Sequence, residues 1–115
     1  MIGDYMADID INKIFKNAEQ GIIHLAETTF TTYKGQAIAD GKAFLNAAKG
    51  DLQNYTQQLA DGDITLDQFK DLMQDEGDLA KMDALKEAGL AHAAFDSFVN
   101  GIIGIMITAA LSAIP

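Results

Sequence analysis

Apolar side chains recur along almost the whole chain at the spacing of an α-helix. From Ile11 to Leu59 an apolar or small residue returns about every 3.7 residues, and from Leu66 to Ala113 about every 3.6 residues. This period is that of a helix that buries one face, whereas a half-buried strand would alternate every second residue. The pattern therefore predicts an all-α fold with almost no β-structure.

The best-marked turn separates the two periodic halves at residues 60–65. Gly62 follows the last periodic positions of the first half, and Thr65 with Gln68 has the spacing of a capping box that starts a new helix. A single domain then consists of an N-terminal tail (1–10), a first helical arm (11–59), the turn (60–65) and a second helical arm (66–115). Matched arms around a short turn predict an antiparallel helical hairpin or a small up-and-down helical bundle.

The continuity of the arms decides between these architectures. An unbroken first arm would be about 70 Å long at about 1.5 Å per residue, and its apolar face would need a second copy of the chain to form a four-helix dimer. Broken arms would fold back as a monomeric bundle. The β-branched run from Thr28 to Tyr33 weakens the first arm, although its apolar members keep the helical register. The candidate breaks are Gly35, Gly50–Asp51, Gly77–Asp78 and Gly89.

The C-terminal segment 98–115 contains no charged residue. As a helix it would span about 27 Å, slightly less than the hydrocarbon thickness of a bilayer, and its isoleucines would surround the whole helix. We favour a core helix wrapped by other helices and completed by oligomerisation. The alternative is a membrane-inserting tail with Gly101 and Gly104 on its packing face, although no flanking Lys, Arg or Trp marks the membrane boundary.

Composition narrows the classes of partner and chemistry. With 49% hydrophobic residues and a single Pro the chain is expected to fold, and with no Cys it has no disulfide, thiolate metal site or thiol nucleophile. The net charge is −9 and every basic residue is a Lys, so we expect no nucleic-acid partner. The N-terminal residues lack the pattern of a secretory signal. A cytoplasmic or virion-associated location is favoured and a membrane-associated one stays open.

Acidic residues are concentrated between Asp61 and Asp78, with only Lys70 among them. Such a run is typical of a solvated helix surface, and the alternatives are a face for a basic partner or a weak divalent-cation site. The residues around Gly62 have the turn glycine of a calcium-binding loop, but Gln57, Leu59 and Gln68 occupy positions where that loop needs ligands.

Candidate catalytic groups are few and poorly placed. His24 and Glu27 share a helical face, but no second pair of this kind completes a metal site. Ser97 lies beside Asp96, yet His92 would lie on another side of the helix. We therefore expect no enzymatic activity, cofactor, metal or small-molecule substrate.

These observations predict a non-catalytic protein that associates with itself through Ala/Gly-rich stripes and the apolar C-terminal helix, with membrane insertion or pore formation by residues 98–115 as the alternative. Aspartate at Ile102 or Met106 is expected to abolish the assembly, because an unpaired buried carboxylate costs several kcal/mol. The predicted interface consists of Ala91, Phe95, Phe98, Val99, Ile102, Ile103, Ile105, Met106 and Leu111, with Ile11, Phe15, Ile22, Phe30 and Phe44 as the opposing stripe.

Overall fold

A computed structural model describes residues 9–78 and 83–114 of the chain. Its helices are α1 (Ile11–Thr29), α2 (Lys34–Ala60), α3 (Leu66–Asp78), α4 (Asp83–Glu87) and α5 (His92–Ala113), and no strand occurs among the described residues. The all-α fold class predicted from the helical spacing is confirmed. Most of the predicted N-terminal tail, residues 1–8, lies outside the described part.

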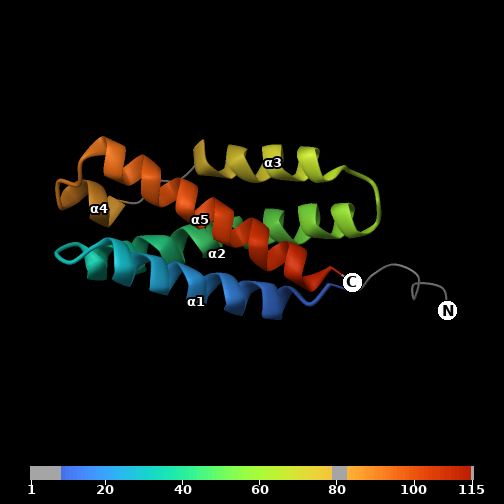
Figure 1. Ribbon diagram of the computed structural model, residues 1–115, viewed down its shortest axis with the longest axis horizontal. Helices are drawn as coiled ribbons and strands as arrows, with labels where there is room; N and C mark the ends of the chain where they lie inside the picture. Colours follow the sequence, from blue (N-terminus) through green and yellow to red (C-terminus); the bar gives the residue numbers. More distant parts are fainter. Residues whose placement is uncertain (1–8, 79–82, 115) are drawn as a thin grey trace.

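The four longer helices lie along the length of the molecule and alternate in direction (Figure 1). α1 packs against α2 and α5, α3 packs against α2 and α5, and the short α4 contacts α2 near the end where α1 turns into α2. The principal extents are 52 × 22 × 19 Å. The long axis is therefore shorter than the arm of about 70 Å that an unbroken first half would form.

The first arm breaks at residues 30–33 and not at any of its glycines. Phe30 has an extended backbone (φ −117°, ψ 136°), and its ring packs edge-on against Phe98 of α5 with 5.1 Å between ring centroids. Gly35 lies in the first turn of α2 and Gly50 lies in its interior, so the predicted breaks at these positions are wrong. The β-branched run weakens the helix at the place where Phe30 gains a buried aromatic contact with α5, and α1 therefore ends there.

The turn between α2 and α3 has the predicted local chemistry. Gly62 has a φ of +82°, a left-handed conformation that glycine adopts without strain. The backbone N–H of Thr65 donates to the Gln68 side chain at 2.8 Å, and the Gln68 N–H donates to the Thr65 hydroxyl at 3.1 Å. This reciprocal pair confirms the capping box. Gly89 also has a positive φ, of +86°, and it follows the end of α4 as the sequence predicts for a helix stop.

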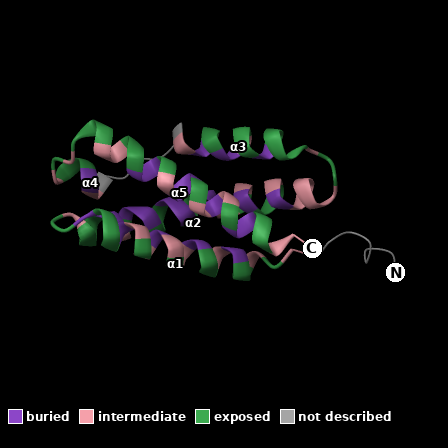
Figure 2. Cartoon of the chain, viewed as in Figure 1, coloured by how far each residue is buried: buried purple, intermediate pink, exposed green. Residues whose placement is uncertain are grey.

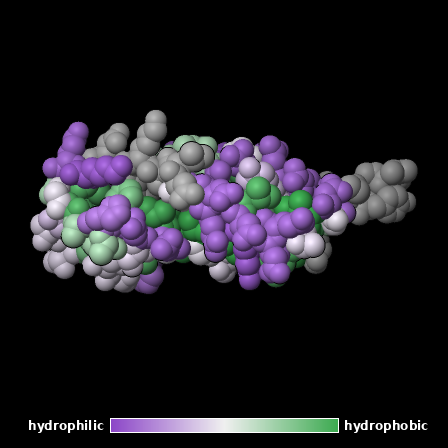
Figure 3. All heavy atoms as spheres, turned by 90° about the horizontal axis from the view of Figure 1, so that it is seen from above, coloured by the Kyte–Doolittle hydropathy of each residue, from purple (hydrophilic) through white to green (hydrophobic). Residues whose placement is uncertain are grey.

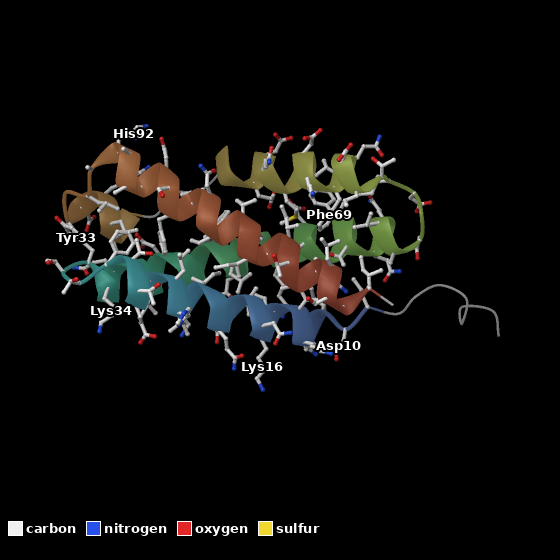
Figure 4. The ribbon with its side chains drawn as sticks, viewed as in Figure 1. Asp10, Lys16, Tyr33, Lys34, Phe69 and His92 are labelled. Atoms are coloured by element: carbon white, nitrogen blue, oxygen red, sulfur yellow. The ribbon has the colours of Figure 1, made fainter. Side chains whose placement is uncertain are left out.

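The core runs along the inner faces of the helices (Figure 2). α5 contributes more buried hydrophobic residues than any other helix, and it is in contact with α1, α2 and α3. On the other side of the bundle Phe69 points inward from α3 and is fully buried (Figure 4). The buried residues of α5 are Phe98, Val99, Ile102, Ile103, Met106, Ala109 and Ala110.

A buried carboxylate of α2 fixes the short helix α4. Asp40 is 8% exposed, and its two oxygens accept the backbone N–H groups of Ala84 at 3.2 Å and Leu85 at 2.7 Å. These N–H groups belong to the first turn of α4, where a helix has no internal acceptors. Asp40 thus acts as a helix cap supplied from another part of the chain.

Candidate functional site

The structure places most of the predicted interface inside a single chain. Ala91 and Leu111 are exposed, and the half-buried members are Ile11, Phe15, Phe95 and Ile105. The buried members are Phe98, Val99, Ile102, Ile103 and Met106 of α5, together with Ile22, Phe30 and Phe44. The two predicted stripes meet as α1 and α2 pack against α5, so the buried residues are not available to a second molecule while the bundle is closed.

Glycines bring these helices close together. A Cβ on Gly21 of α1 would lie 2.8 Å from Ile105 Cγ2 of α5, and a Cβ on Gly101 of α5 would lie 2.8 Å from Leu25 Cδ2 of α1. Real Cβ atoms do not approach other carbons this closely, so the absence of a side chain is what allows this packing. Gly101, which the sequence places on a packing face of the C-terminal segment, therefore packs against α1 within the same chain.

Part of α5 faces outward and carries no charge. Asn100, Gly104, Thr108, Leu111 and Ser112 are all exposed, and we call these residues the outer strip of α5. Leu111 is one of the few large hydrophobic side chains of the described part that stay exposed, at 38%. A Cβ on Gly104 would meet no atom within 4 Å, unlike a Cβ on Gly101. The helix backbone at Gly104 is thus open to an approaching partner.

Grooves run on both sides of the outer strip. A groove of about 520 Å³ between α1 and α5 is lined only by uncharged residues, including Asn17, Gly21 and Gly104. A second groove, of about 650 Å³ between α3 and α5, is lined by Gln74, Asp75 and α5 residues that again include Gly104. Figure 3, which views the molecule from the α3 side, shows hydrophobic surface in limited areas between hydrophilic residues. Gly104 therefore lies between two depressions that could take the ridges of another helix.

α5 is also long and apolar enough to cross a membrane. An 18-residue window within its 22 residues has a mean hydropathy of 1.6, and 39% of that window is buried inside the bundle. Length and composition alone are weak support, since the central helix of a water-soluble bundle has the same character.

Acidic groups meet where α3 packs against α2. Glu76 of α3 is 7% exposed and shares a hydrogen bond with Asp51 of α2. Burial, together with the neighbouring carboxylates of Asp51 and Asp75, raises the pKa of Glu76 to about 7. Burial and the same group of carboxylates also raise the pKa of the Tyr55 hydroxyl.

The burial of Glu76 and Asp40 was not predicted, although the spacing contains the signal. Glu76 follows the buried Phe69 and Met73 by seven and three residues, which places it on the same helical face. Asp40 follows the buried Ala37 by three residues and precedes the buried Phe44 by four, which also places it on a buried helical face. A carboxylate at such a position needs a partner, which Asp51 supplies to Glu76 and the first turn of α4 supplies to Asp40.

His92 and the turn around Gly62 take part in local contacts. His92 pairs with Asp96 one turn later, with 3.2 Å between Nε2 and Oδ2, and both side chains are largely exposed. Gln57 donates to Asp61 at 2.8 Å and Gln68 serves the capping box, so these side chains stabilise the turn around Gly62. Within residues 9–78 and 83–114, no three His, Asp or Glu side chains lie close enough to hold a metal ion.

Comparison of the chain with protein families, with curated proteins and with solved structures finds no match.

Proposed function

We propose that the protein is a non-catalytic association module, and that two copies pair through the outer strip of α5. The observation that carries the proposal is Gly104, an exposed helical glycine with open space above its backbone. A glycine in a helix interior costs about 1 kcal/mol of stability relative to alanine. Within one chain, Gly104 offsets this cost with no close packing. The missing side chain would allow a helix of another molecule to pack closely against the backbone at Gly104.

The chemistry of the outer strip suits a second copy of the same chain. In a two-fold pair each strip would face itself, so Gly104 would lie near its symmetry mate and the hydroxyls of Thr108 and Ser112 would lie near the interface. A chain of net charge −9 repels its own copies, and an uncharged contact surface avoids adding to that repulsion. Added salt is therefore expected to strengthen the pair, because it screens the charges outside the contact.

This proposal moves the contact from the buried stripe predicted by the sequence to the opposite side of the same helix. The buried stripe forms the core of one chain and leaves the outer strip as the uncharged surface of α5. Association then needs no opening of the bundle.

The test compares two glycine substitutions that differ only in place. Gly104→Gln adds a side chain on the outer strip, and Gly50→Gln adds the same side chain at an exposed position of α2 where a Cβ also meets nothing within 4 Å. Both variants should fold and be at least as stable as the wild type, because glutamine is the better helix former. Light-scattering mass across a dilution series in detergent-free buffer should give dimers for the wild type and Gly50→Gln, and monomers for Gly104→Gln. A monomeric wild type, or a dimeric Gly104→Gln, would contradict the proposal.

A second candidate function, insertion of α5 into a lipid bilayer, is favoured by the length and hydropathy of that helix. Its test is flotation with neutral and with anionic liposomes. Thr108→Asp adds an exposed charge in the middle of the uncharged segment, which the folded bundle tolerates and a bilayer does not. Thr32→Asp, at an exposed position in the turn after α1, is the matched control. Flotation of the wild type and of Thr32→Asp, lost in Thr108→Asp, would support insertion; no flotation of the wild type would exclude it.

A further inference from the structure

A carboxyl pair lies at the contact between α2 and α3. The Glu76 side chain is 7% exposed and is hydrogen-bonded to Asp51 on the neighbouring helix, which is half-buried. Two ionised carboxylates are both acceptors only and repel each other. A hydrogen bond between them requires one proton on the pair, so this contact can form only while the pair holds a proton.

Within residues 9–78 and 83–114, the charged groups that act on Glu76 are carboxylates. α2 supplies Asp51 and the Tyr55 hydroxyl, and α3 supplies Asp75 beside Glu76. α5, the other helix packed against α3, contributes a further acid, since Asp96 lines a depression together with Gln74 and Gly77 of α3. Of the described lysines, Lys49 has its ammonium 4.6 Å from the ring centre of Phe15 in α1, and Lys70 is exposed on α3.

α3 is the helix that such a charge would disturb most. It lies on the outside of the bundle and is held by contacts with α2 and α5. Its buried anchors are Phe69, which Figure 4 labels, and Met73. Its last turn contains no basic residue, so the carboxylates there oppose the negative end of the helix dipole. Gly77 of α3 lies close to Val99 and Ile103 of α5, and loss of α3 would expose both side chains.

We propose that Glu76 and Asp51 form a proton-dependent clasp that holds α3 against the bundle. When the shared proton is lost, α3 is released and the Val99 and Ile103 side of α5 becomes accessible. This inference concerns the fold of one chain and does not require the association proposed above.

The direction of the pH dependence follows from the two states of Glu76. In the docked helix burial raises the pKa to about 7, and in a released, solvated helix it returns toward its ordinary value of 4.5. The docked state therefore binds the proton more tightly, and docking weakens as the pH rises from the released value through the docked value. Below the released value both states are protonated and the docking equilibrium no longer changes. The total change in the ratio of docked to released α3 is at most a few hundred-fold.

Hydrogen exchange of the full chain tests the clasp, read by NMR at about pH 6 and about pH 8.5 and corrected for the intrinsic pH dependence of exchange. The α3 amides of Phe69 and Met73 report release, and the Ile22 amide in α1 is the internal reference. In the wild type the protection of α3 should fall about tenfold relative to α1 over this range. Glu76→Gln should abolish the fall, because its amide donates to the Asp51 carboxylate at every pH.

The control removes a charge from the exposed neighbour. Asp75→Asn should keep most of the wild-type fall, and Asp51→Asn should reduce it, because its side-chain amide can donate to the ionised Glu76 carboxylate. Unchanged α3 protection in the wild type, an equal fall in Glu76→Gln, or an equal loss of protection in α1 and α3 would each overturn the clasp. Repeating the measurement in Gly104→Gln separates this result from association. If the pH-dependent fall persists in that variant, the clasp is supported whether or not two chains pair.

Discussion

At the scale of single residues, the glycines of this chain divide by what surrounds them. A Cβ on Gly41 of α2 would overlap the Cγ2 of Ile22 in α1, which is fully buried, whereas a Cβ on Gly50 of the same helix would meet nothing within 4 Å. Gly41→Ala should therefore lower the free energy of unfolding by about 1–3 kcal/mol, because the packed side chains must shift. Gly50→Ala should raise it by about 0.5–1 kcal/mol through helix propensity.

Urea denaturation followed by circular dichroism measures both changes in the same helix. Opposite signs are the result that identifies Gly41 as a packing residue. If Gly41→Ala stabilises the chain as much as Gly50→Ala does, the close contact between α1 and α2 is not as tight as the structure places it.

At the scale of elements, α4 depends on a side chain that is more than forty residues away in sequence. A helix of five residues has no stability of its own, so the hydrogen bonds from Ala84 and Leu85 to Asp40 hold its first turn. Asp40→Ala leaves both N–H groups without this acceptor and should cost about 1–3 kcal/mol. Asp40→Asn keeps one oxygen acceptor and should cost less. Denaturation gives the totals, and hydrogen exchange of the Leu85 amide localises the effect; equal stability of the alanine, asparagine and wild-type chains would rule out the cap.

The elements also show which features can be predicted from the sequence. The capping box at Thr65 and the glycine stops at Gly62 and Gly89 were predictable, because each depends on residues within one turn. The break at Phe30 was not, because its gain comes from the ring of Phe98, almost seventy residues later. Gly50 stays helical for a similar reason.

Two long-range effects keep α2 continuous there. Ala48 and Leu52 flank Gly50 and are buried on one face, which outweighs the cost of about 1 kcal/mol for a helical glycine. Asp51, which would have capped a new helix, instead meets Glu76 of α3. The candidate site was likewise predictable only in part. The apolar character of α5 was evident from composition, but only the packing shows which side of this helix is covered by α1, α2 and α3.

At the scale of the whole molecule, the question is whether α5 is a core helix of a bundle that one chain forms alone. Ile102 and Leu111 lie on the same helix, but Ile102 is fully buried among the other helices and Leu111 is 38% exposed. An unpaired carboxylate at Ile102 should cost several kcal/mol, a large part of the 5–15 kcal/mol that stabilises a typical domain. We therefore expect Ile102→Asp to unfold the chain itself, a more severe outcome than the loss of assembly predicted from the sequence.

Leu111→Asp makes the same chemical change on the outer strip, where water solvates the carboxylate, so it should leave the fold intact. Thermal unfolding followed by circular dichroism distinguishes the two variants, with a cooperative transition retained in Leu111→Asp and lost in Ile102→Asp. In the same samples, light scattering should show that Leu111→Asp is monomeric, because two copies would bring the new charges together at the proposed contact. Equal destabilisation by the two substitutions would mean that the two sides of α5 do not differ in burial. A stable, folded Ile102→Asp would mean that the core of the molecule lies elsewhere.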